Sequence, residues 1–248
     1  MSIRILPGAP ALLIEAREVC LVISDLHLGF ERRLEAQGIH VPEQTSALLE
    51  RAVSLGKEAG AKRLISIGDV KDELGRGSLY ASKAVSDFFR AAARAFDRVD
   101  VVPGNHDGEL GNLLPSYVRL VSVKGLVIRT GEGNVGLFHG HAYPSTAVAT
   151  AGVLVTGHQH LILARKGERQ AVWLQSTFGE AQRLRRLIVM PAFNPLLTGT
   201  PLGRVGMSRW NPVLSDFINP SSTDVFLQDG TLLGKLETLK EILEVEVD

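Results

Sequence analysis

Short runs of apolar, mostly β-branched residues recur along the first two thirds of the chain, and polar residues interrupt them only at their ends. Such runs are typical of strands that are covered on both faces. The sequence therefore predicts five buried strands, at Val19–Ser24, Arg63–Ile67, Val99–Val102, Val135–Phe138 and Gly152–Thr156.

Two longer segments between the first three runs carry apolar residues at helical spacing. Helices are predicted at Gln44–Gly60, where Leu48 and Ala52 share one face, and at Ser78–Phe96, where Val85 and Phe89 do. The resulting order of strand, helix, strand, helix, strand favours a parallel sheet with right-handed crossovers.

The last third of the chain has a different pattern. Further strands are predicted at Ala171–Gln175 and Leu187–Met190, and a hairpin at Thr223–Gln228 and Thr231–Leu236, because the intervening Asp-Gly pair suits a two-residue turn. Residues 191–220 contain five prolines and predict a long irregular segment. We expect a single domain over residues 1–248, with residues 191–248 as a loop-rich extension packed on it.

Composition narrows the class of protein only slightly. The formal net charge is zero, so any attraction to nucleic acid or membrane would have to come from a local patch. The single cysteine, Cys20, excludes an internal disulfide framework and a thiolate zinc cluster. The start of the chain lacks the apolar core of a signal peptide, and no apolar stretch reaches the roughly 18 residues of a membrane span. We therefore expect a cytoplasmic protein without a membrane partner.

Six of the seven histidines lie in five short motifs, each at the end of a predicted strand. The motifs are Asp25-Leu26-His27, Gly68-Asp69-Val70-Lys71-Asp72, Gly104-Asn105-His106-Asp107, His139-Gly140-His141 and Gly157-His158-Gln159-His160. Carboxylate, imidazole and amide groups bind divalent cations of hard to borderline character. Because the carboxyl ends of strands in an open α/β sheet share one edge, the motifs predict a two-metal hydrolase site.

As a set, the motifs resemble those of the calcineurin-like metallophosphoesterases over residues 25–160. The resemblance implies an α/β fold of four layers, in which two mixed β-sheets pack face to face between helices. It also implies a dinuclear site. One cation would take Asp25, His27, Asp69 and His160, and the other would take Asp69, Asn105, His139 and His158. Ligands without thiolate suit Mn²⁺, which we expect, and also Fe²⁺ or Zn²⁺.

The resemblance further implies two residues that act without holding a metal. His106 corresponds to the residue that this family uses near the leaving group, where an imidazole can donate a proton to the departing oxygen. Asp72 would orient His106. The nucleophile would be a water molecule whose pKa the cations lower to about 7. His141 is expected to contact a metal ligand or the substrate rather than a cation.

Two further comparisons concern the subfamily. Protein Ser/Thr phosphatases follow the equivalent of Asp72 with Arg-Gly, whereas Glu73-Leu74 stands here, which disfavours that activity. The segments Asp25-Leu26-His27-Leu28-Gly29, Gly38-Ile39-His40-Val41-Pro42 and Pro191-Ala192-Phe193 resemble the DNA-ligase-associated phosphoesterases and their archaeal relatives. Phe30 replaces a lysine of the bacterial members.

These features favour a metal-dependent phosphoesterase that hydrolyses phosphodiester bonds, such as a DNA or RNA nuclease associated with DNA-processing proteins. A small-nucleotide phosphatase or phosphodiesterase is the alternative, and zero net charge suits it better. A metal-binding scaffold without catalysis is a third hypothesis, although a scaffold needs no such complete set of ligands. The basic cluster Arg183, Arg185 and Arg186 is predicted to bind substrate phosphates if the loop after it folds back over the site.

Overall fold

The computed structural model describes residues 2–74, 78–165, 167–204 and 212–245. In these residues the first of two sheets has six strands, in the order β1-β2-β3-β4-β5-β6. Strands β3 to β6 are parallel to one another, and β1 and β2 add antiparallel strands at one edge. The strands are β1 (Ile3–Ile5), β2 (Ala11–Glu15), β3 (Val19–Ser24), β4 (Arg63–Ile67), β5 (Arg98–Val102) and β6 (Arg119–Leu120).

The second sheet is also mixed, with the order β13-β10-β11-β12-β9-β8-β7 and with β14 and β15 branching from β11. Its centre is parallel, because β8, β9 and β12 run in the same direction. The strands are β7 (Leu126–Thr130), β8 (Gly133–Leu137), β9 (Val153–Thr156), β10 (Leu161–Arg165), β11 (Glu168–Phe178), β12 (Arg185–Val189), β13 (Thr200–Pro201), β14 (Thr223–Leu227) and β15 (Leu232–Lys235).

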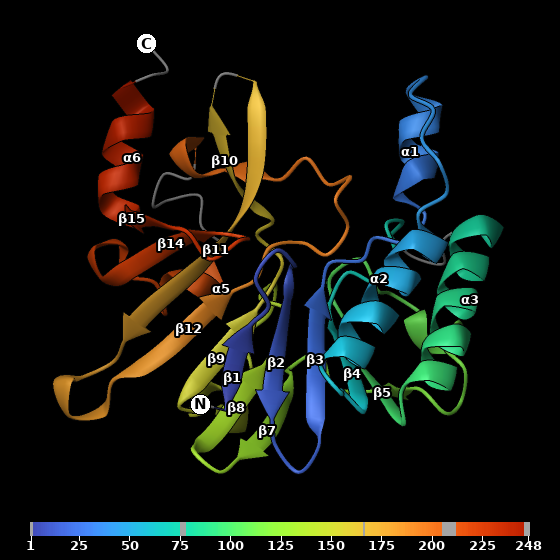
Figure 1. Ribbon diagram of the computed structural model, residues 1–248, viewed down its shortest axis with the longest axis horizontal. Helices are drawn as coiled ribbons and strands as arrows, with labels where there is room; N and C mark the ends of the chain where they lie inside the picture. Colours follow the sequence, from blue (N-terminus) through green and yellow to red (C-terminus); the bar gives the residue numbers. More distant parts are fainter. Residues whose placement is uncertain (1, 75–77, 166, 205–211, 246–248) are drawn as a thin grey trace.

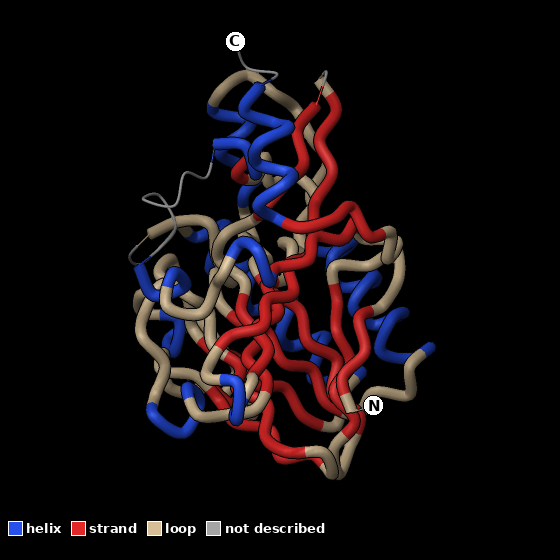
Figure 2. Tube along the Cα trace, turned by 90° about the vertical axis from the view of Figure 1, so that its left-hand side faces the viewer, coloured by secondary structure: helices blue, strands red, loops and turns tan. Residues whose placement is uncertain are grey.

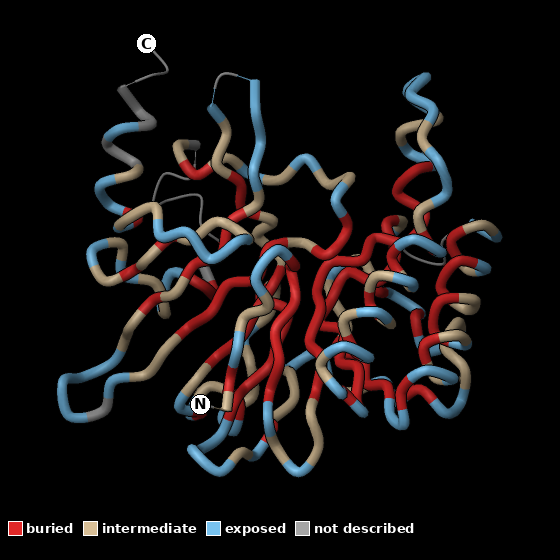
Figure 3. The backbone as a smooth tube through the Cα atoms, in the orientation of Figure 1, coloured by how far each residue is buried: buried red, intermediate tan, exposed pale blue. Residues whose placement is uncertain are grey.

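Helices cover the outer face of each sheet, and the strands lie between them (Figures 1 and 2). Helices α2 (Thr45–Glu58) and α3 (Leu79–Ala95) pack on the first sheet. The second sheet carries α4 (Thr146–Ala149), α5 (Pro212–Ser215) and α6 (Leu236–Val245). A further helix, α1 (Phe30–Ala36), follows β3 directly and ends in an exposed tip (Figure 3).

Three hydrophobic cores correspond to the three interfaces between layers. One joins the first sheet to α2 and α3, and another joins the second sheet to its helices. The third lies between the sheets, where Val22 and Ile67 meet Leu137, Val155 and other apolar side chains of the second sheet. This arrangement confirms the predicted four-layer α/β fold with two mixed sheets.

The predicted strands and the two predicted helices are all present, with ends shifted by a few residues at most, except that β11 is much longer than expected. The C-terminal hairpin forms as β14 and β15, and it pairs with β11 of the second sheet. The segment from residue 191 begins beside the end of β3, where the Phe193 amide donates to the Ser24 carbonyl at 2.8 Å. The stretch predicted to be irregular, residues 191–220, contains β13 and α5, and residues 205–211 of it lie outside the described part of the chain. Within the described residues, no helix is long and apolar enough to cross a membrane.

Candidate metal centre

The motif residues lie where strands end, and the two sheets bring them together. Asp25 and His27 follow β3, and Asp69 follows the neighbouring parallel strand β4. His139 follows β8, and His158 follows its parallel neighbour β9. Because both parallel blocks end on the same side of the core between the sheets, loops distant in sequence meet at one place.

Three groups of possible ligand atoms form there, one of which is His27, Asp72 and His106. The other two share the carboxylate of Asp69. Asp25, His27, Asp69 and His160 make one group, and Asp69, His139 and His158 make the other. In each group the ligand atoms all lie within 4.8 Å of one another. Both groups correspond to the ligand sets expected from the sequence, apart from Asn105. That residue is exposed in the turn between Gly104 and His106, and its role as a ligand stays a prediction.

The distances suit ligands that converge on a cation rather than on one another. His160 Nε2 lies 2.9 Å from Asp25 Oδ1, and His27 Nε2 lies 3.5 Å from Asp69 Oδ2. Neighbouring ligands that are each about 2.1 Å from one cation lie about 3 Å apart. Both Nε2 atoms are buried and have no partner with hydrogen-bond geometry. These residues therefore fit the divalent cations that the ligand set implies.

Contacts of Nδ1 on the far side of two rings direct the Nε2 atom of each ring towards the cluster. His27 Nδ1 lies 3.2 Å from Asp72 Oδ1, and His139 Nδ1 lies 3.3 Å from the Ile67 carbonyl oxygen. A ring that donates from Nδ1 presents the lone pair of Nε2 to the cluster, as metal-binding histidines usually do.

The electrostatics of the cluster favour added positive charge. His139 is completely buried, which by itself lowers the pKa of an imidazole, yet contact with Asp69 and Asp25 raises its pKa to about 9. Burial would raise the pKa of Asp25, but His160 and His139 outweigh it and hold that pKa at about 2. The two carboxylates thus stay ionised and draw a proton onto His139, at a place where a cation would supply the charge instead.

The backbone at the site is held in an unusual conformation. Of the described non-glycine residues, six have a clearly positive φ, a region that most side chains avoid. Five of the six are predicted ligands, namely Asp25, His27, Asp69, His158 and His160, with φ between 41° and 70°. Such backbone strain clusters at functional sites, because the surrounding fold must enforce it.

Three motif glycines make room for the ligands. A Cβ atom on Gly68 would overlap the His139 ring, and one on Gly104 would overlap the carboxylate and backbone nitrogen of Asp69. A Cβ on Gly157 would overlap the Asp25 carboxylate. Any side chain at these positions would displace a ligand, which explains why glycine precedes a ligand in three of the motifs.

His106 belongs to neither of the groups that share Asp69, but it forms the third group of possible ligand atoms with His27 and Asp72. Its backbone amide donates to Asp69 Oδ1 at 3.0 Å, and its ring Nδ1 lies 2.5 Å from the Asp72 carbonyl oxygen. The Nε2 atom is then free, 4.0 Å from Asp69 Oδ2. Asp72 thus contacts His106 through its backbone, whereas its carboxylate contacts His27 and Arg33, the latter at 3.5 Å.

Two residues of the motifs have structural parts that the sequence pattern did not assign. The Asp107 carboxylate accepts hydrogen bonds from the backbone amides of Val70, Lys71 and Gly104. Lys71 is completely buried, and its Nζ donates to the carbonyl oxygens of Glu73 and His106. Together they fasten the loop after β4 to the loop after β5. The sequence feature that could have indicated these roles is that both residues lie inside motifs that contain predicted metal ligands.

Of the remaining residues predicted to contact substrate, some lie near the ligands and others do not. The His141 ring lies 5.2 Å from His139 and 6.2 Å from His158, measured between centroids, so it borders the second group. Arg185 instead donates to the Ala149 carbonyl and stacks on Phe178.

The predicted basic cluster lies away from the ligands. Arg186 pairs with Val153 where β12 and β9 begin, whereas the ligands follow the end of β9. The structure therefore does not bring Arg185 or Arg186 to the cluster. The side chain of Arg183 lies outside the described part of the chain.

A four-layer α/β fold with carboxylates and imidazoles at its strand ends is the architecture of a metal-dependent phosphoesterase. The family model of calcineurin-like phosphoesterases matches residues 19–176, more than half of the chain, and the protein belongs to this family.

Several solved structures are similar to this chain. The nuclease MPE of Pseudomonas putida is 18% identical with a TM-score of 0.54, and the match covers 92% of this chain and 97% of that one. YfcE, a phosphoesterase from E. coli, is 20% identical over 87% and 97% of the two chains, with a TM-score of 0.44. An archaeal phosphodiesterase is 15% identical over 73% and 88%, with a TM-score of 0.41. The search of curated proteins gave no match.

Proposed function

We propose that the protein is a dinuclear metal-dependent phosphodiesterase that acts on nucleic acid. The observation that carries the proposal is the pair of ligand groups that share Asp69. Asp69 would contribute its carboxylate to both cations, and two-metal sites of this kind serve in-line displacement at phosphorus. Manganese is the metal that we expect, because the ligands are carboxylates and imidazoles without thiolate.

The chain's own residues have distinct parts in this proposal. A pair of divalent cations, when bound, neutralises charge on the phosphoryl oxygens and supplies a water of lowered pKa as the nucleophile. His106 holds its ring in place through Nδ1 and keeps Nε2 for a proton that passes to the leaving oxygen. Asp72 fixes the tautomer of His27 through its carboxylate.

The resemblance to DNA-ligase-associated phosphoesterases supports a nucleic acid substrate. Two of the three segments that carry it, the one after β3 and the one that begins at Pro191, lie side by side. The Asn194 side-chain amide donates to the Leu26 carbonyl at 2.9 Å, and the Phe193 amide donates to Ser24. Both segments therefore belong to one unit of structure that holds the first ligand loop.

A single screen tests the proposal. Purified protein with Mn²⁺ is assayed against a chromogenic phosphodiester, a chromogenic monoester, and labelled single- and double-stranded DNA, with the His106→Ala variant as the control for contaminating nuclease. We expect cleavage of the diester and of DNA by the wild type, and a large loss in the variant. Activity confined to the monoester would favour the small-nucleotide hypothesis, and no activity with both metals bound would favour the scaffold hypothesis.

A further inference from the structure

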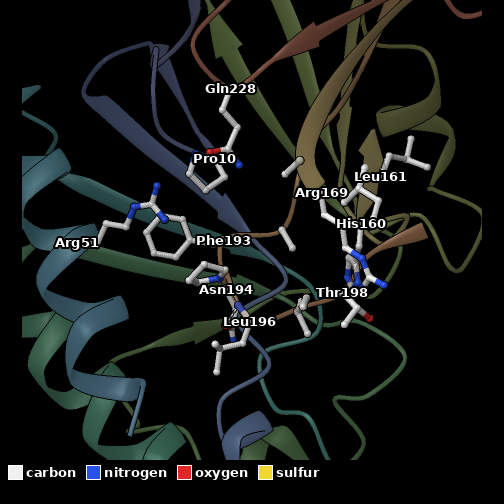
Figure 4. Close-up of a pocket in the computed structure, with 15 residues that line it drawn as sticks. Pro10, Arg51, His160, Leu161, Arg169, Phe193, Asn194, Leu196, Thr198 and Gln228 are labelled. Atoms are coloured by element: carbon white, nitrogen blue, oxygen red, sulfur yellow. Dashed lines mark hydrogen bonds between the residues drawn. The ribbon is translucent and has the colours of Figure 1, made fainter. Parts of the chain in front are cut away.

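Beside the metal centre lies a cavity of about 390 Å³ that the mechanism above does not use. The segment of residues 192–198 forms its floor, and strands β10 and β11, helix α2, Pro10 and Gln228 enclose it. His160, a predicted metal ligand, lines one side of it. Figure 4 shows Arg51 across the cavity from His160, with Phe193 and Asn194 between them. The cavity therefore opens next to the place where a phosphate would be cleaved.

The charged groups of this cavity are all basic. Arg51 and Arg169 line it, and no acidic residue does so among the described residues. Neither guanidinium has a carboxylate within ion-pair distance in the described part of the chain. Arg51 is half-buried, donates only weakly to the Gly8 carbonyl at 3.5 Å, and lies 5.2 Å above the Phe193 ring. Two arginines that face one cavity without an acidic partner provide a site for an anion.

Apolar side chains form part of the cavity wall, and the remaining polar side chains are the amides of Asn194 and Gln228 and the hydroxyl of Thr198. Pro10, Leu161 and Phe193 provide flat or aliphatic surface. Gln228 offers a side chain that can both donate and accept hydrogen bonds, as the edge of a nucleobase requires. Small-molecule sites have volumes of about 300–1,000 Å³, so this cavity has a size that suits a single nucleotide.

We propose that this cavity is a nucleotide subsite, which holds the nucleoside next to the scissile phosphate and binds that nucleotide's other phosphate through Arg51 and Arg169. The inference rests on the proposed function, because a flanking nucleotide exists only in a diester substrate. It narrows the substrate to a single strand, or to the unpaired end of a duplex. An attached base and second phosphate would then add affinity that a small diester lacks.

A second hollow allows the strand to continue. Its volume is about 490 Å³, and it shares Arg169, Pro195 and Gln228 with the first. It extends towards Asp229 at the turn between β14 and β15. The cavity is therefore not closed behind the first nucleotide, and the subsite can accept an internal position of a strand as well as an end.

Equilibrium binding to the Mn²⁺-loaded protein tests the subsite without any need for catalysis. The probes are thymidine 3′,5′-bisphosphate and inorganic phosphate, because the cations would hold one phosphate of either probe, but only the nucleotide has a base and a second phosphate that reach the cavity. We expect the wild type to bind the nucleotide about 10–100-fold more tightly than it binds phosphate. The double variant Arg51→Gln/Arg169→Gln should lose most of that preference. The control Arg90→Gln/Arg94→Gln removes two exposed charges from α3, away from the cavity, and should keep it.

Two results would overturn the subsite, namely a wild type that binds the nucleotide no better than phosphate, or a double variant that keeps the preference. Hydrolysis gives an independent measurement. In the double variant, kcat/KM for a single-stranded oligonucleotide should fall about tenfold further than kcat/KM for a chromogenic diester, mainly through KM. If no diester is hydrolysed at all, the proposed function fails, while the binding preference still decides whether the subsite exists.

Discussion

Replacing a motif glycine by alanine can destabilise the protein in two ways, by straining the backbone and by crowding a ligand. Substitutions at different glycines separate the two effects. Three substitutions by alanine are compared. Gly60→Ala places a methyl group in open space at a φ of +63°. Gly104→Ala has no positive φ, but its Cβ overlaps Asp69. Gly68→Ala combines both costs, since φ is +80° and the Cβ overlaps the buried His139 ring.

The expected magnitudes follow from these differences. A non-glycine residue in the left-handed region of backbone conformation destabilises the folded protein by about 1–2 kcal/mol. Alanine also makes the unfolded chain less flexible than glycine does, which offsets about 0.4–1 kcal/mol of that loss. Gly60→Ala should therefore lose about 1 kcal/mol of unfolding free energy. Crowding in a packed interior costs about 1–3 kcal/mol, which applies to Gly104→Ala without the backbone cost. Gly68→Ala should lose roughly 2–4 kcal/mol, and each kcal/mol lowers Tm by about 2–4 °C in a chain of this size.

The assay pairs thermal unfolding in EDTA with the metal content after dialysis against Mn²⁺. Gly60→Ala should bind two cations like the wild type. Gly68→Ala should lose the cation held by His139 and His158. Gly104→Ala should lose affinity at both sites, because Asp69 belongs to both groups of ligands.

One outcome would refute this reasoning. If Gly104→Ala unfolds at the wild-type temperature and binds two cations with unchanged affinity, the glycine does not make room for the carboxylate. A loss of metal in Gly60→Ala as large as in the other two variants would show instead that the effect comes from general destabilisation.

Mn²⁺ should restore the most activity to a chelated sample and Mg²⁺ little, and full activity of metal-free protein would exclude the mechanism. Mn²⁺ at 100 times its Kd should also add about 2.7 kcal/mol of unfolding free energy, read as a rise in Tm. Asp69→Asn should lower the content of both cations, whereas His106→Ala should keep both and slow turnover by about 10²–10⁴-fold; loss of metal in His106→Ala would contradict its assigned role. Burial raises the pKa of the Cys20 thiol to about 11, so a thiol reagent at pH 8 should label only unfolded protein, and rapid labelling of native protein would disprove that burial.

Sequence patterns predicted the central strands because these strands are covered on both faces, which leaves an uninterrupted apolar signal. They did not predict β1, whose three residues Ile3–Ile5 alternate in burial and are too few for a periodic signal. Helix α1 was also missed, because Phe30–Ala36 is short, largely polar, and buries only Phe30 and Glu31. Packing against other elements, rather than local propensity, decides both segments.

The ligand residues were predictable because each motif places its carboxylate or imidazole directly after a strand. The contacts that orient these side chains could not be predicted from the sequence. Nothing in the sequence shows that the Asp72 carboxylate contacts His27 while its backbone contacts His106. The basic residues near the site were not predicted either. Arg185 and Arg186 lie at the start of β12, away from the ligands, whereas Arg51 and Arg169 come from elements distant in sequence and line one cavity only in the folded chain.

The division of the ligands between the sheets has a mechanical consequence. Asp25, His27 and Asp69 belong to the first sheet, whereas His139, His158 and His160 belong to the second. Each of the two groups that share Asp69 contains members from both, so a cation bound in either of them would be a cross-link between two layers whose interface is mainly apolar. Such a cross-link closes a loop of more than a hundred residues between Asp25 and His160, as a disulfide would in an oxidising compartment. A protein that has bound its metals would then also resist separation of its two layers more strongly than the metal-free protein.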